Sequence, residues 1–529
     1  MTGPAQGGPL RIGAGPLDLD VVVGAARRAG TRCELDATAL DRMHRSRRTK
    51  LDALANDIPI YGVTTGFGDS ANRQIAPRRA ARLQENLIRC HLNGTGPAAP
   101  PDVVRATMLI RANSLARGVS AINPAVVERL LDLLAHDVLP VVPQRGSVGA
   151  SGDLVPLSHV AAALLGEGEV DRDGDRAPAV DALAAAGIPI SEPEAKDGLA
   201  LINGTSFSTA VAVLTLAEAE RFAEVAEIAT ATAIEAVRGN RGHHAAFLHA
   251  QKPHPGQVRA AARITELLDG SRLALDHTQL LAKNPPLGDA AVVDLDRAIQ
   301  DRYSLRCAPH VIGVLHDTTE WVRRWLTVEV NSANDNPLFD PDSADVYSGG
   351  NFYGGHVAQA MDSLKVAVAN VVDLLDRQIE LMVDARFSNG LPSNLVRPDP
   401  DEDGLHHGFK GMQIAASAAT AEALAGCMPA GVFSRSTESH NQDKVSMSAP
   451  AARSSRAVLE PASEVAAIHL LTACQAVDLR GPEQSSPACT RVRAVVRREC
   501  RFVDHDRALH RDVAAVQRMI ADGQIPGAE

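Results

Sequence analysis

A long run of apolar residues at helical spacing restricts the fold of this chain more than any other feature. Between residues 361 and 382 the apolar side chains recur at steps of three and four, which places them on one face of an α-helix. The residues on this face are Met361, Leu364, Val368, Val371, Leu375, Ile379 and Met382. A helix with such a face buries it against other helices, so the second half of the chain is predicted to form a helical bundle.

A second helix is predicted from the apolar spacing between residues 222 and 237. Its apolar positions are Phe222, Val225, Ala229, Ala233 and Val237. Arg238 then falls in the last turn and Gly239 lies just beyond it. Because this order is usual at the C-terminal end of a helix, we expect the helix to end there.

The interior of the 529-residue chain contains no long linker rich in Pro, Gly and Ser. We expect a mainly α protein with a disordered lead over residues 1–16, a smaller N-terminal region over 17–204 and a helical-bundle region over 205–529. Aromatic residues make up only 3% of the chain. Long alanine-rich helices are therefore expected to be covered in part by helices of other subunits.

The composition excludes several classes of partner. The formal net charge is -11, so the chain lacks the basic surface that binds nucleic acid or an anionic membrane. No unbroken apolar run reaches the roughly eighteen residues of a membrane-spanning helix, and residues 1–16 lack the pattern of a signal peptide. The seven cysteines form no CxxC pair, which is typical of a reducing compartment. We expect a cytoplasmic location.

Residues 146–152 are a run of small residues, Gly-Ser-Val-Gly-Ala-Ser-Gly. The Lys-Ser/Thr pair of a phosphate-binding loop does not follow them, so nucleotide binding is not expected. One interpretation is a turn in which Ser151 or Asp153 caps the following helix. The other interpretation is chemical, since the Gly152 nitrogen can attack the carbonyl carbon of Ala150, and loss of water then converts Ser151 into a methylidene group. Glycine suits this position because it leaves the attacking nitrogen uncrowded.

A metal-dependent hydrolase is an alternative class of enzyme, because the chain contains the histidine pairs His243-His244 and His406-His407. Adjacent histidines on a helix point in different directions, however. Neither an HExxH motif nor a pair of cysteines at ligand spacing accompanies them. No metal site is expected from these pairs.

Several segments, in order along most of the chain, resemble the aromatic amino acid and histidine ammonia-lyase family. They are Tyr61-Gly-Val-Thr-Thr-Gly-Phe-Gly68, Gly146 to His159, Leu201-Ile-Asn-Gly-Thr-Ser206, Gln300-Asp-Arg-Tyr-Ser-Leu-Arg306, Asn331-Ser-Ala-Asn-Asp-Asn-Pro337, Gly349-Gly-Asn-Phe352 and Asn441-Gln-Asp443. The resemblance implies the ammonia-lyase (fumarase/aspartase-like) fold, with a long central helical bundle and a smaller N-terminal region that carries the prosthetic-group loop. It also implies a homotetramer.

The resemblance further implies a methylidene-imidazolone prosthetic group, formed autocatalytically from Ala150-Ser151-Gly152 without a metal or a nucleotide. In that family the residue corresponding to Tyr61 is the catalytic base that removes the β-proton, and the residue corresponding to Tyr303 helps at the departing amine. A phenol with a pKa of about 10 is a poor base. We therefore expect cationic neighbours or helix N-termini to lower the pKa of Tyr61.

The same resemblance implies that Arg306 binds the substrate carboxylate through a bidentate pair. Asn203 and Gln300 match positions that hydrogen-bond the substrate or the prosthetic ring, and Phe352 matches one that packs beside it. From the residue types alone, Arg306 equally suits the surface start of a helix, Asn203 and Gln300 suit turns, and Phe352 suits a core.

Substrate selectivity in this family depends on a residue pair that aligns with Cys90-His91. Cys-His looks most like the Ser-His of histidine lyases and of some bacterial tyrosine lyases and aminomutases, and His91 can hydrogen-bond a phenol or an imidazole. Gln442 lies where histidine lyases place a glutamate, which counts against histidine. Lys410 and Glu438 match the phenylalanine branch, where they could pair near the substrate, although an ordinary solvated ion pair is the alternative.

The sequence thus predicts an ammonia-lyase that converts an aromatic L-amino acid, tyrosine or phenylalanine ahead of histidine, into an arylacrylate. Three alternatives stay open: a lyase for histidine or a histidine derivative, an aromatic amino acid 2,3-aminomutase, and an inert scaffold of the same shape. The expected partners are the amino acid and other copies of the chain, with no nucleic acid and no membrane.

Overall fold

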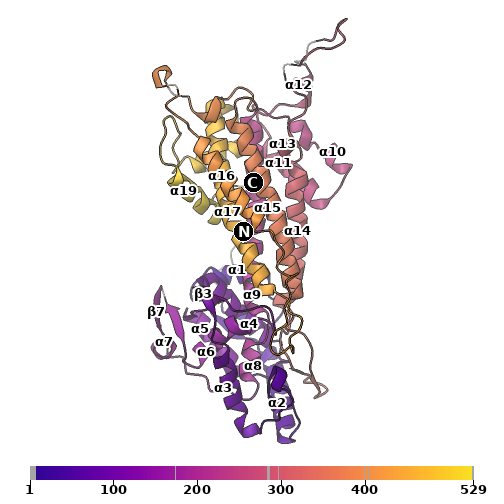
Figure 1. Cartoon of the computed structure of the whole chain (residues 1–529), viewed down its shortest axis with the longest axis vertical. Coiled ribbons are helices and arrows are strands. Elements are labelled where there is room, and N and C mark those ends of the chain that lie inside the picture. Colours follow the sequence, from indigo (N-terminus) through magenta and orange to yellow (C-terminus); the bar gives the residue numbers. More distant parts are fainter. Residues whose placement is uncertain are drawn as a thin grey trace. The chain divides into compact units, whose positions relative to one another are not determined.

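The computed structural model describes residues 8–172, 174–282, 286–295, 297–397, 399–402 and 404–526. The chain divides into two compact units, each made of three segments (Figure 1). Unit 1 comprises residues 1–217, 322–362 and 429–454, and unit 2 comprises 218–321, 363–428 and 455–529. Four of the five boundaries between the units fall inside long helices, namely α9 (Ser206–Ala236), α14 (Ala308–Val330), α15 (Gly355–Val383) and α17 (Ser448–Arg480), and the fifth falls at residues 428–429, before α17.

Unit 1 is built from helices with small sheets at their edges. Its helices are α1 (Leu19–Ala26), α2 (Ala37–Ala55), α3 (Ala80–Cys90), α4 (Pro101–Leu115), α5 (Pro124–Ala135), α6 (Leu154–Leu164), α7 (Ala179–Ala186) and α8 (Asp197–Ile202). Short 3-10 turns lie at η1 (Gly68–Ser70) and η2 (Pro77–Arg79). Helix α4 is buried along most of its length, so it forms the centre of this unit.

The strands of unit 1 pair in four small sheets. They are β1 (Leu10–Ile12) with β2 (Cys33–Leu35), β3 (Thr95–Ala98) with β5 (Pro143–Arg145), β4 (Leu139–Pro140) with β6 (Glu169–Arg172) and β7 (Asp175–Pro178), and β8 (Leu338–Phe339) with β9 (Val346–Tyr347). The first pair is parallel and the others are antiparallel.

Strand β1 corrects part of the expected disordered lead over residues 1–16. Leu10 pairs with Cys33 and Ile12 with Leu35, and the Ile12 side chain is buried. Residues 10–12 therefore belong to the fold, because a partner strand lies later in the sequence. Residues 1–7 lie outside the described residues.

All the named secondary-structure elements in the described part of unit 2 are helices or 3-10 turns. Besides the long helices it contains α10 (Ala246–Ala250), α11 (Pro255–Leu267), α12 (His277–Ala282), α13 (Tyr303–Arg306), α16 (Lys410–Ala425), α18 (Pro487–Val496) and α19 (His510–Ala521). Its 3-10 turns are η3 (Arg241–His244), η4 (Ser393–Leu395), η5 (Pro400–Glu402) and η6 (Pro482–Gln484). The mainly α fold predicted from the sequence is confirmed.

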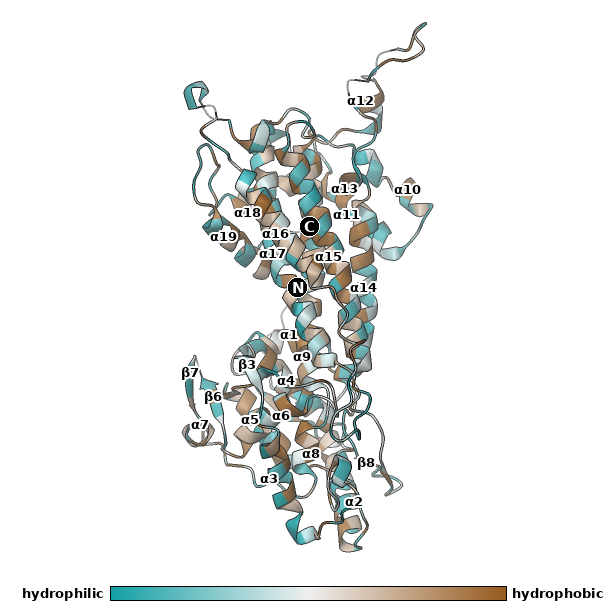
Figure 2. Cartoon of the chain, viewed as in Figure 1, coloured by the Kyte–Doolittle hydropathy of each residue, from teal (hydrophilic) through white to brown (hydrophobic). Residues whose placement is uncertain are grey.

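The apolar face predicted between residues 361 and 382 lies on α15, and all seven of its residues are buried. Figure 2 shows hydrophobic and hydrophilic residues alternating around the long helices, as expected when one face of each helix packs inside. The periodicity therefore identified both the helix and its buried side.

The end of α9 differs from the prediction by a few residues. The helix ends at Ala236, and Arg238 rather than Gly239 takes the left-handed conformation, with a φ of 55°. The Gly239 N–H donates to the Ile234 carbonyl, and the Arg238 N–H donates to the Glu235 carbonyl. These two bonds form the Schellman motif, in which any residue that tolerates a positive φ can occupy the left-handed position.

One helix among the described residues, α17, is long and apolar enough to span a membrane. Within the protein, however, 78% of its most apolar window is buried. Burial of that kind is expected of a core helix, and α17 serves as one.

Candidate active site

The stretch of small residues forms a tight turn between β5 and α6 in unit 1. Gly149, Ser151 and Gly152 all have positive φ values, of 74°, 53° and 77°. Serine adopts such a conformation uncommonly, so the surrounding contacts must hold it. A Cβ atom at Gly152 would lie 2.2 Å from the carbonyl oxygen of Gly204. The turn therefore requires glycine at position 152.

Asp153 links this turn to the start of α9. Its carboxylate accepts the Ser208 backbone N–H at 2.7 Å and the Ser147 hydroxyl at 2.9 Å. The Asp153 N–H donates to the Gly204 carbonyl at 2.7 Å. Asp153 precedes α6 but makes no side-chain cap there. The capping interpretation therefore requires correction, because the Asp153 side chain satisfies the N-terminus of α9.

Two amide side chains hold Ser151. The Gln442 Nε2 donates to the Ser151 hydroxyl at 3.1 Å, and the Asn203 Nδ2 donates to the Ser151 carbonyl at 2.9 Å. The Thr437 hydroxyl donates to Gln442 Oε1 at 3.1 Å, which fixes the orientation of that amide. Asn203 Oδ1 is buried without a hydrogen-bond partner. The sequence predicted Asn203 and Gln442 as site residues, and the structure brings both to Ser151.

Arg111 holds the backbone at Asn203 in place. The sequence did not predict this residue as part of the site. Its guanidinium donates to the carbonyls of Asn203 at 3.0 Å, Asn334 at 2.8 Å and Ala200. Burial lowers the pKa of Arg111 to about 10, so the group stays charged at neutral pH. The available signal was an arginine directly after the apolar residues Met108, Leu109 and Ile110 in the segment that becomes α4.

Tyr61 lies partly buried in a loop of the same unit. Its hydroxyl oxygen accepts the Gly68 N–H at 3.0 Å. Burial raises the pKa of Tyr61, and the Glu438 carboxylate raises it further, while the Gly68 N–H acts in the opposite direction. The expected lowering of this pKa is therefore wrong for unit 1 by itself, because burial and a negative charge outweigh one backbone dipole. Residues 58–60, which precede Tyr61, lie in an irregular segment.

Glu438 packs directly against the loop that carries Tyr61. Its carboxylate accepts the Asp69 N–H at 3.2 Å. A Cβ atom at Gly68 would lie 1.6 Å from Glu438 Oε1. Gly68 also has a φ of 52°, so only glycine allows this approach. Glu438 therefore contacts the loop closely and adds to the effect of burial on the pKa of Tyr61.

Cys90 and His91 lie at the C-terminal end of α3. The His91 Nδ1 is 2.8 Å from the Leu87 carbonyl and 3.2 Å from the Cys90 sulfur. In neutral His91, donation from Nδ1–H to the carbonyl leaves Nε2 as a hydrogen-bond acceptor. The pair can therefore recognise a ring that presents an O–H or N–H donor.

The remaining predicted residue of unit 1 is Phe352, which lies in the turn before α15 and is half-buried. Its packing beside the prosthetic ring stays a prediction.

Unit 2 contains the other four predicted residues. Gln300, Tyr303 and Arg306 line a cavity of about 640 Å³ that also includes Arg302 and Phe387. The Arg306 guanidinium carbon lies 4.5 Å from the centre of the Tyr303 ring, and the Arg302 guanidinium carbon lies 4.2 Å from that of Phe387. The cavity thus combines cationic groups with aromatic faces, as binding of a carboxylate beside a ring requires.

Lys410 is the fourth of these residues and the first residue of α16, where it is exposed. Its predicted pairing with Glu438 stays a prediction, because the two residues belong to different units.

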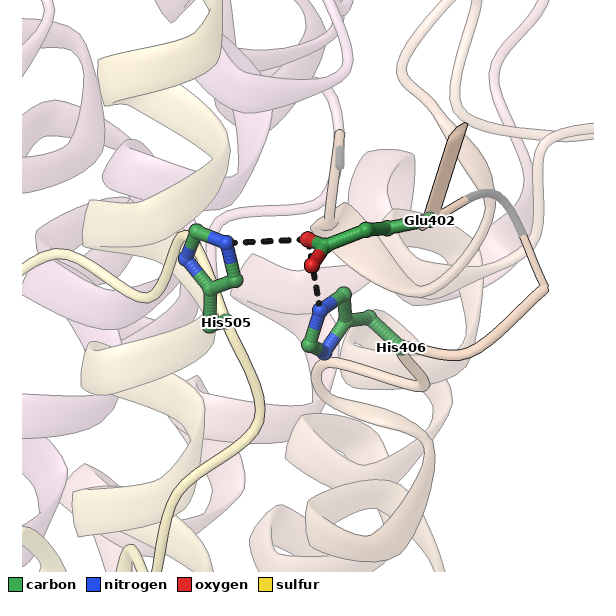
Figure 3. Close-up of side chains that lie close together, drawn as sticks. All are labelled: Glu402, His406 and His505. Atoms are coloured by element: carbon green, nitrogen blue, oxygen red, sulfur yellow. Dashed lines mark hydrogen bonds and ion pairs between the residues drawn. The ribbon is translucent and has the colours of Figure 1, made fainter. Parts of the chain in front are cut away.

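His406 and His505 in unit 2 share the carboxylate of Glu402 (Figure 3). The Glu402 Oε2 lies 3.3 Å from His406 Nε2 and 3.1 Å from His505 Nε2. The Asp506 N–H donates to His406 Nδ1 at 3.1 Å. With that lone pair occupied, the proton of neutral His406 sits on Nε2 and donates to Glu402. A metal would need Nε2 unprotonated, so the geometry describes a hydrogen-bonded cluster.

Comparison with known proteins shows the family to which the chain belongs. A family model described as aromatic amino acid lyase matches residues 17–498. The chain belongs to the aromatic amino acid lyase family. A tyrosine ammonia-lyase of Cupriavidus metallidurans is 41% identical over 475 residues, which cover 89% of this chain and 88% of the relative. A histidine ammonia-lyase of Gloeobacter violaceus is 38% identical over 509 residues, covering 96% and 95%.

The solved structure of a tyrosine aminomutase from Streptomyces globisporus matches with a TM-score of 0.93 at 38% identity and covers 98% of each chain. The family resemblance in the sequence is thereby confirmed, and this member of the family is a carbon–nitrogen lyase.

Proposed function

We propose that this family member eliminates ammonia from an aromatic L-amino acid, with tyrosine or phenylalanine preferred, using a prosthetic group made from Ala150-Ser151-Gly152. The observation that carries the proposal is the arrangement around Ser151. One donor is aimed at its hydroxyl and another at its carbonyl, in a turn that admits glycine alone at position 152.

The residues present fit a methylidene-imidazolone. Closing the ring joins the Gly152 nitrogen to the Ala150 carbonyl carbon and releases the Ala150 oxygen as water. A second loss of water removes the Ser151 hydroxyl together with its α-proton. Gln442 donates to the oxygen that must leave, and Asn203 donates to the carbonyl that the ring keeps. The buried, unpartnered Asn203 Oδ1 leaves one acceptor free at this position. When formed, the group would supply an electrophilic carbon to the substrate.

The other residues bind the substrate and move protons. We assign removal of the β-proton to Tyr61 and assistance at the departing amine to Tyr303. Arg306 binds the substrate carboxylate and Gln300 hydrogen-bonds the substrate. Because unit 1 alone holds the Tyr61 phenol neutral, the complete enzyme must add positive charge near it.

We propose that the complete site forms in a homotetramer. The predicted residues divide between unit 1 and unit 2. In the single chain Tyr303 is 71% exposed, and the apolar residues Val328 and Met428 are 68% and 67% exposed. Contact with further copies would cover them, since exposed apolar groups of this kind mark interfaces. All seven cysteines are free, which fits the cytoplasmic location that we also propose.

His91 favours tyrosine as the substrate. Its Nε2 is available as an acceptor for a phenol O–H, whereas phenylalanine offers no such donor. The relative that is 41% identical is a tyrosine ammonia-lyase. Histidine is the second candidate, because an imidazole N–H could use the same acceptor and a histidine ammonia-lyase is 38% identical. The tyrosine aminomutase supports β-amino acid formation as a third.

The purified tetramer should be incubated separately with tyrosine, phenylalanine and histidine. Ammonia, the ultraviolet absorbance of the acrylate and any β-amino acid are followed, with Ser151→Ala as the control. We expect acrylate and ammonia from tyrosine. A β-amino acid would make the protein an aminomutase, and turnover of histidine alone would make it a histidine lyase. No product from any substrate would contradict the proposal.

A further inference from the structure

The turn that carries Tyr303 and Arg306 is hydrogen-bonded to a buried polar side chain from another helix. This turn is α13, a single helical turn of four residues. The Gln378 Nε2, from α15, donates to the carbonyl oxygen of Ser304 at 2.8 Å. Gln378 is fully buried, so its amide must satisfy its hydrogen bonds within the protein. Ser304 lies between the two predicted site residues in this short turn. A hydrogen bond to its carbonyl oxygen therefore restricts the orientation of the whole turn.

We propose that Gln378 and His469 are positioning residues, which set the orientation of α13 and with it the side chains of Tyr303 and Arg306. This inference rests on the function proposed above and adds two residues that touch neither the substrate nor the prosthetic group.

His469 determines which way the Gln378 amide points. The His469 Nε2 lies 2.8 Å from Gln378 Oε1. Burial lowers the pKa of His469 to about 3, so the ring is neutral at neutral pH and carries one proton. An amide oxygen can only accept, so that proton must sit on Nε2. His469 Nδ1 is buried and unpartnered, as expected of the unprotonated nitrogen.

With its oxygen held by His469, the Gln378 amide presents its N–H groups to the other side. One N–H donates to Ser304 and another to the Thr230 hydroxyl at 3.0 Å. Rotating the amide by half a turn would place two oxygens, those of Gln378 and Ser304, against each other. The orientation is therefore a single state, and three helices of unit 2 fix it: α9, α15 and α17.

Asp301, two residues before α13, is held by a second set of hydrogen bonds. The Asp301 carboxylate accepts the Asn240 N–H at 2.5 Å, and the Asp301 N–H donates to His243 Nε2 at 3.1 Å. Arg297 lies 3.2 Å from the same carboxylate. With Asp301 and Ser304 both held, the residues between and just after them have little freedom. Loss of the Gln378 bond would release one of the two attachment points.

The first test is Gln378→Met, which nearly keeps the volume and removes the hydrogen bonds to Ser304, Thr230 and His469. We expect kcat/KM to fall by about tenfold or more, because displacement of a positioned group by a fraction of an ångström is enough to slow catalysis. KM should rise because Arg306 is displaced from the substrate carboxylate, and kcat should fall because Tyr303 is displaced from the departing amine. The loss of mass that accompanies formation of the prosthetic group should be unaffected, because that group forms in unit 1.

Hydrogen exchange gives a measure that does not depend on activity. The N–H groups of Leu305 and Arg306 donate to the Arg302 carbonyl, and that of Cys307 donates to the Tyr303 carbonyl. In Gln378→Met, exchange in a peptide covering residues 300–307 should rise, while exchange elsewhere in unit 2 stays unchanged. The matched control is Asn370→Leu on the exposed side of α15, whose amide bonds only to its own helix.

A second pair of variants protects the test if Gln378→Met folds poorly. His469→Gln keeps a buried N–H donor and should retain most of the activity, whereas His469→Leu should behave like Gln378→Met. Unchanged exchange over residues 300–307 in Gln378→Met, or equal effects of the two His469 variants, would overturn the proposal. If the wild-type protein proves inactive but exchange rises as expected, the positioning role stands and only the proposed function fails.

Discussion

Ser151 is the residue on which the proposed prosthetic group depends. Ring closure and loss of its hydroxyl remove two waters, so the wild-type chain should weigh about 36 Da less than its sequence, by stoichiometry. Ser151→Ala has no hydroxyl to lose and should lack the full mass deficit and all turnover, while its thermal unfolding stays close to wild type. Intact-mass spectrometry measures the deficit directly. A wild-type mass equal to the sequence mass would identify an inert scaffold.

Glu438 should control the pH at which Tyr61 becomes a base. Its carboxylate raises the pKa of Tyr61, and removing that negative charge favours the phenolate. In Glu438→Gln the alkaline rise of kcat/KM should therefore move to lower pH. Glutamine keeps an oxygen for the Asp69 N–H, so the loop should persist. The pH profile of the variant is the measurement, and Tyr61→Phe, which lacks the ionising group, is the control.

At the scale of elements, buried histidines in unit 2 should make the free energy of unfolding depend on pH. Burial lowers the pKa of both His244 and His469 to about 3, from an ordinary 6.5. Between these values the unfolded chain binds protons that the folded chain does not. The free energy of unfolding should consequently fall as the pH drops below about 6.5, by up to about 1.4 kcal/mol per pH unit for each histidine.

Urea unfolding between pH 7 and 4.5 would measure this slope. The double variant His244→Gln, His469→Gln removes both titrating rings and should flatten the curve. An equally steep curve in the double variant would assign the effect to other groups.

The elements also show which features a sequence pattern can predict. The apolar face of α15 was predictable because helical periodicity is local and burial follows it directly. Strand β1 was not predicted, because its partner β2 is separate in the sequence and three residues carry little pattern. The contact between Gln442 and Ser151 joins residues 291 positions apart. Only the family resemblance, and no spacing rule, pointed to Gln442.

Arg111 and Gln378 show a second limit. Both are buried polar residues in helices, and their roles come from carbonyl groups on other elements. A single polar residue on a buried face indicates that such a partner exists without indicating which one. The expected lowering of the Tyr61 pKa was wrong for a related reason, since the sequence could not show that the fold would bury Tyr61 and bring Glu438 close to it.

At the scale of the whole molecule, the proposed assembly makes a prediction about mixed tetramers. Ser151→Ala inactivates a residue of unit 1, and Tyr303→Phe alters one of unit 2. If one catalytic site takes Ser151 and Tyr303 from different copies, a tetramer that contains both variants regains sites with both wild-type residues. Random assembly at equal expression should restore about a quarter of the wild-type activity, since each residue has an even chance of being intact.

The two variants are co-expressed with different affinity tags, and the mixed tetramers are assayed after purification through both tags. Ser151→Ala with Asn203→Ala is the matched control. These residues contact each other in one copy, so their mixture should stay inactive. Recovery in the first mixture alone would show that the site is shared between copies. Inactivity of both mixtures would mean that each chain completes its own site, and the tetramer would then serve stability rather than catalysis.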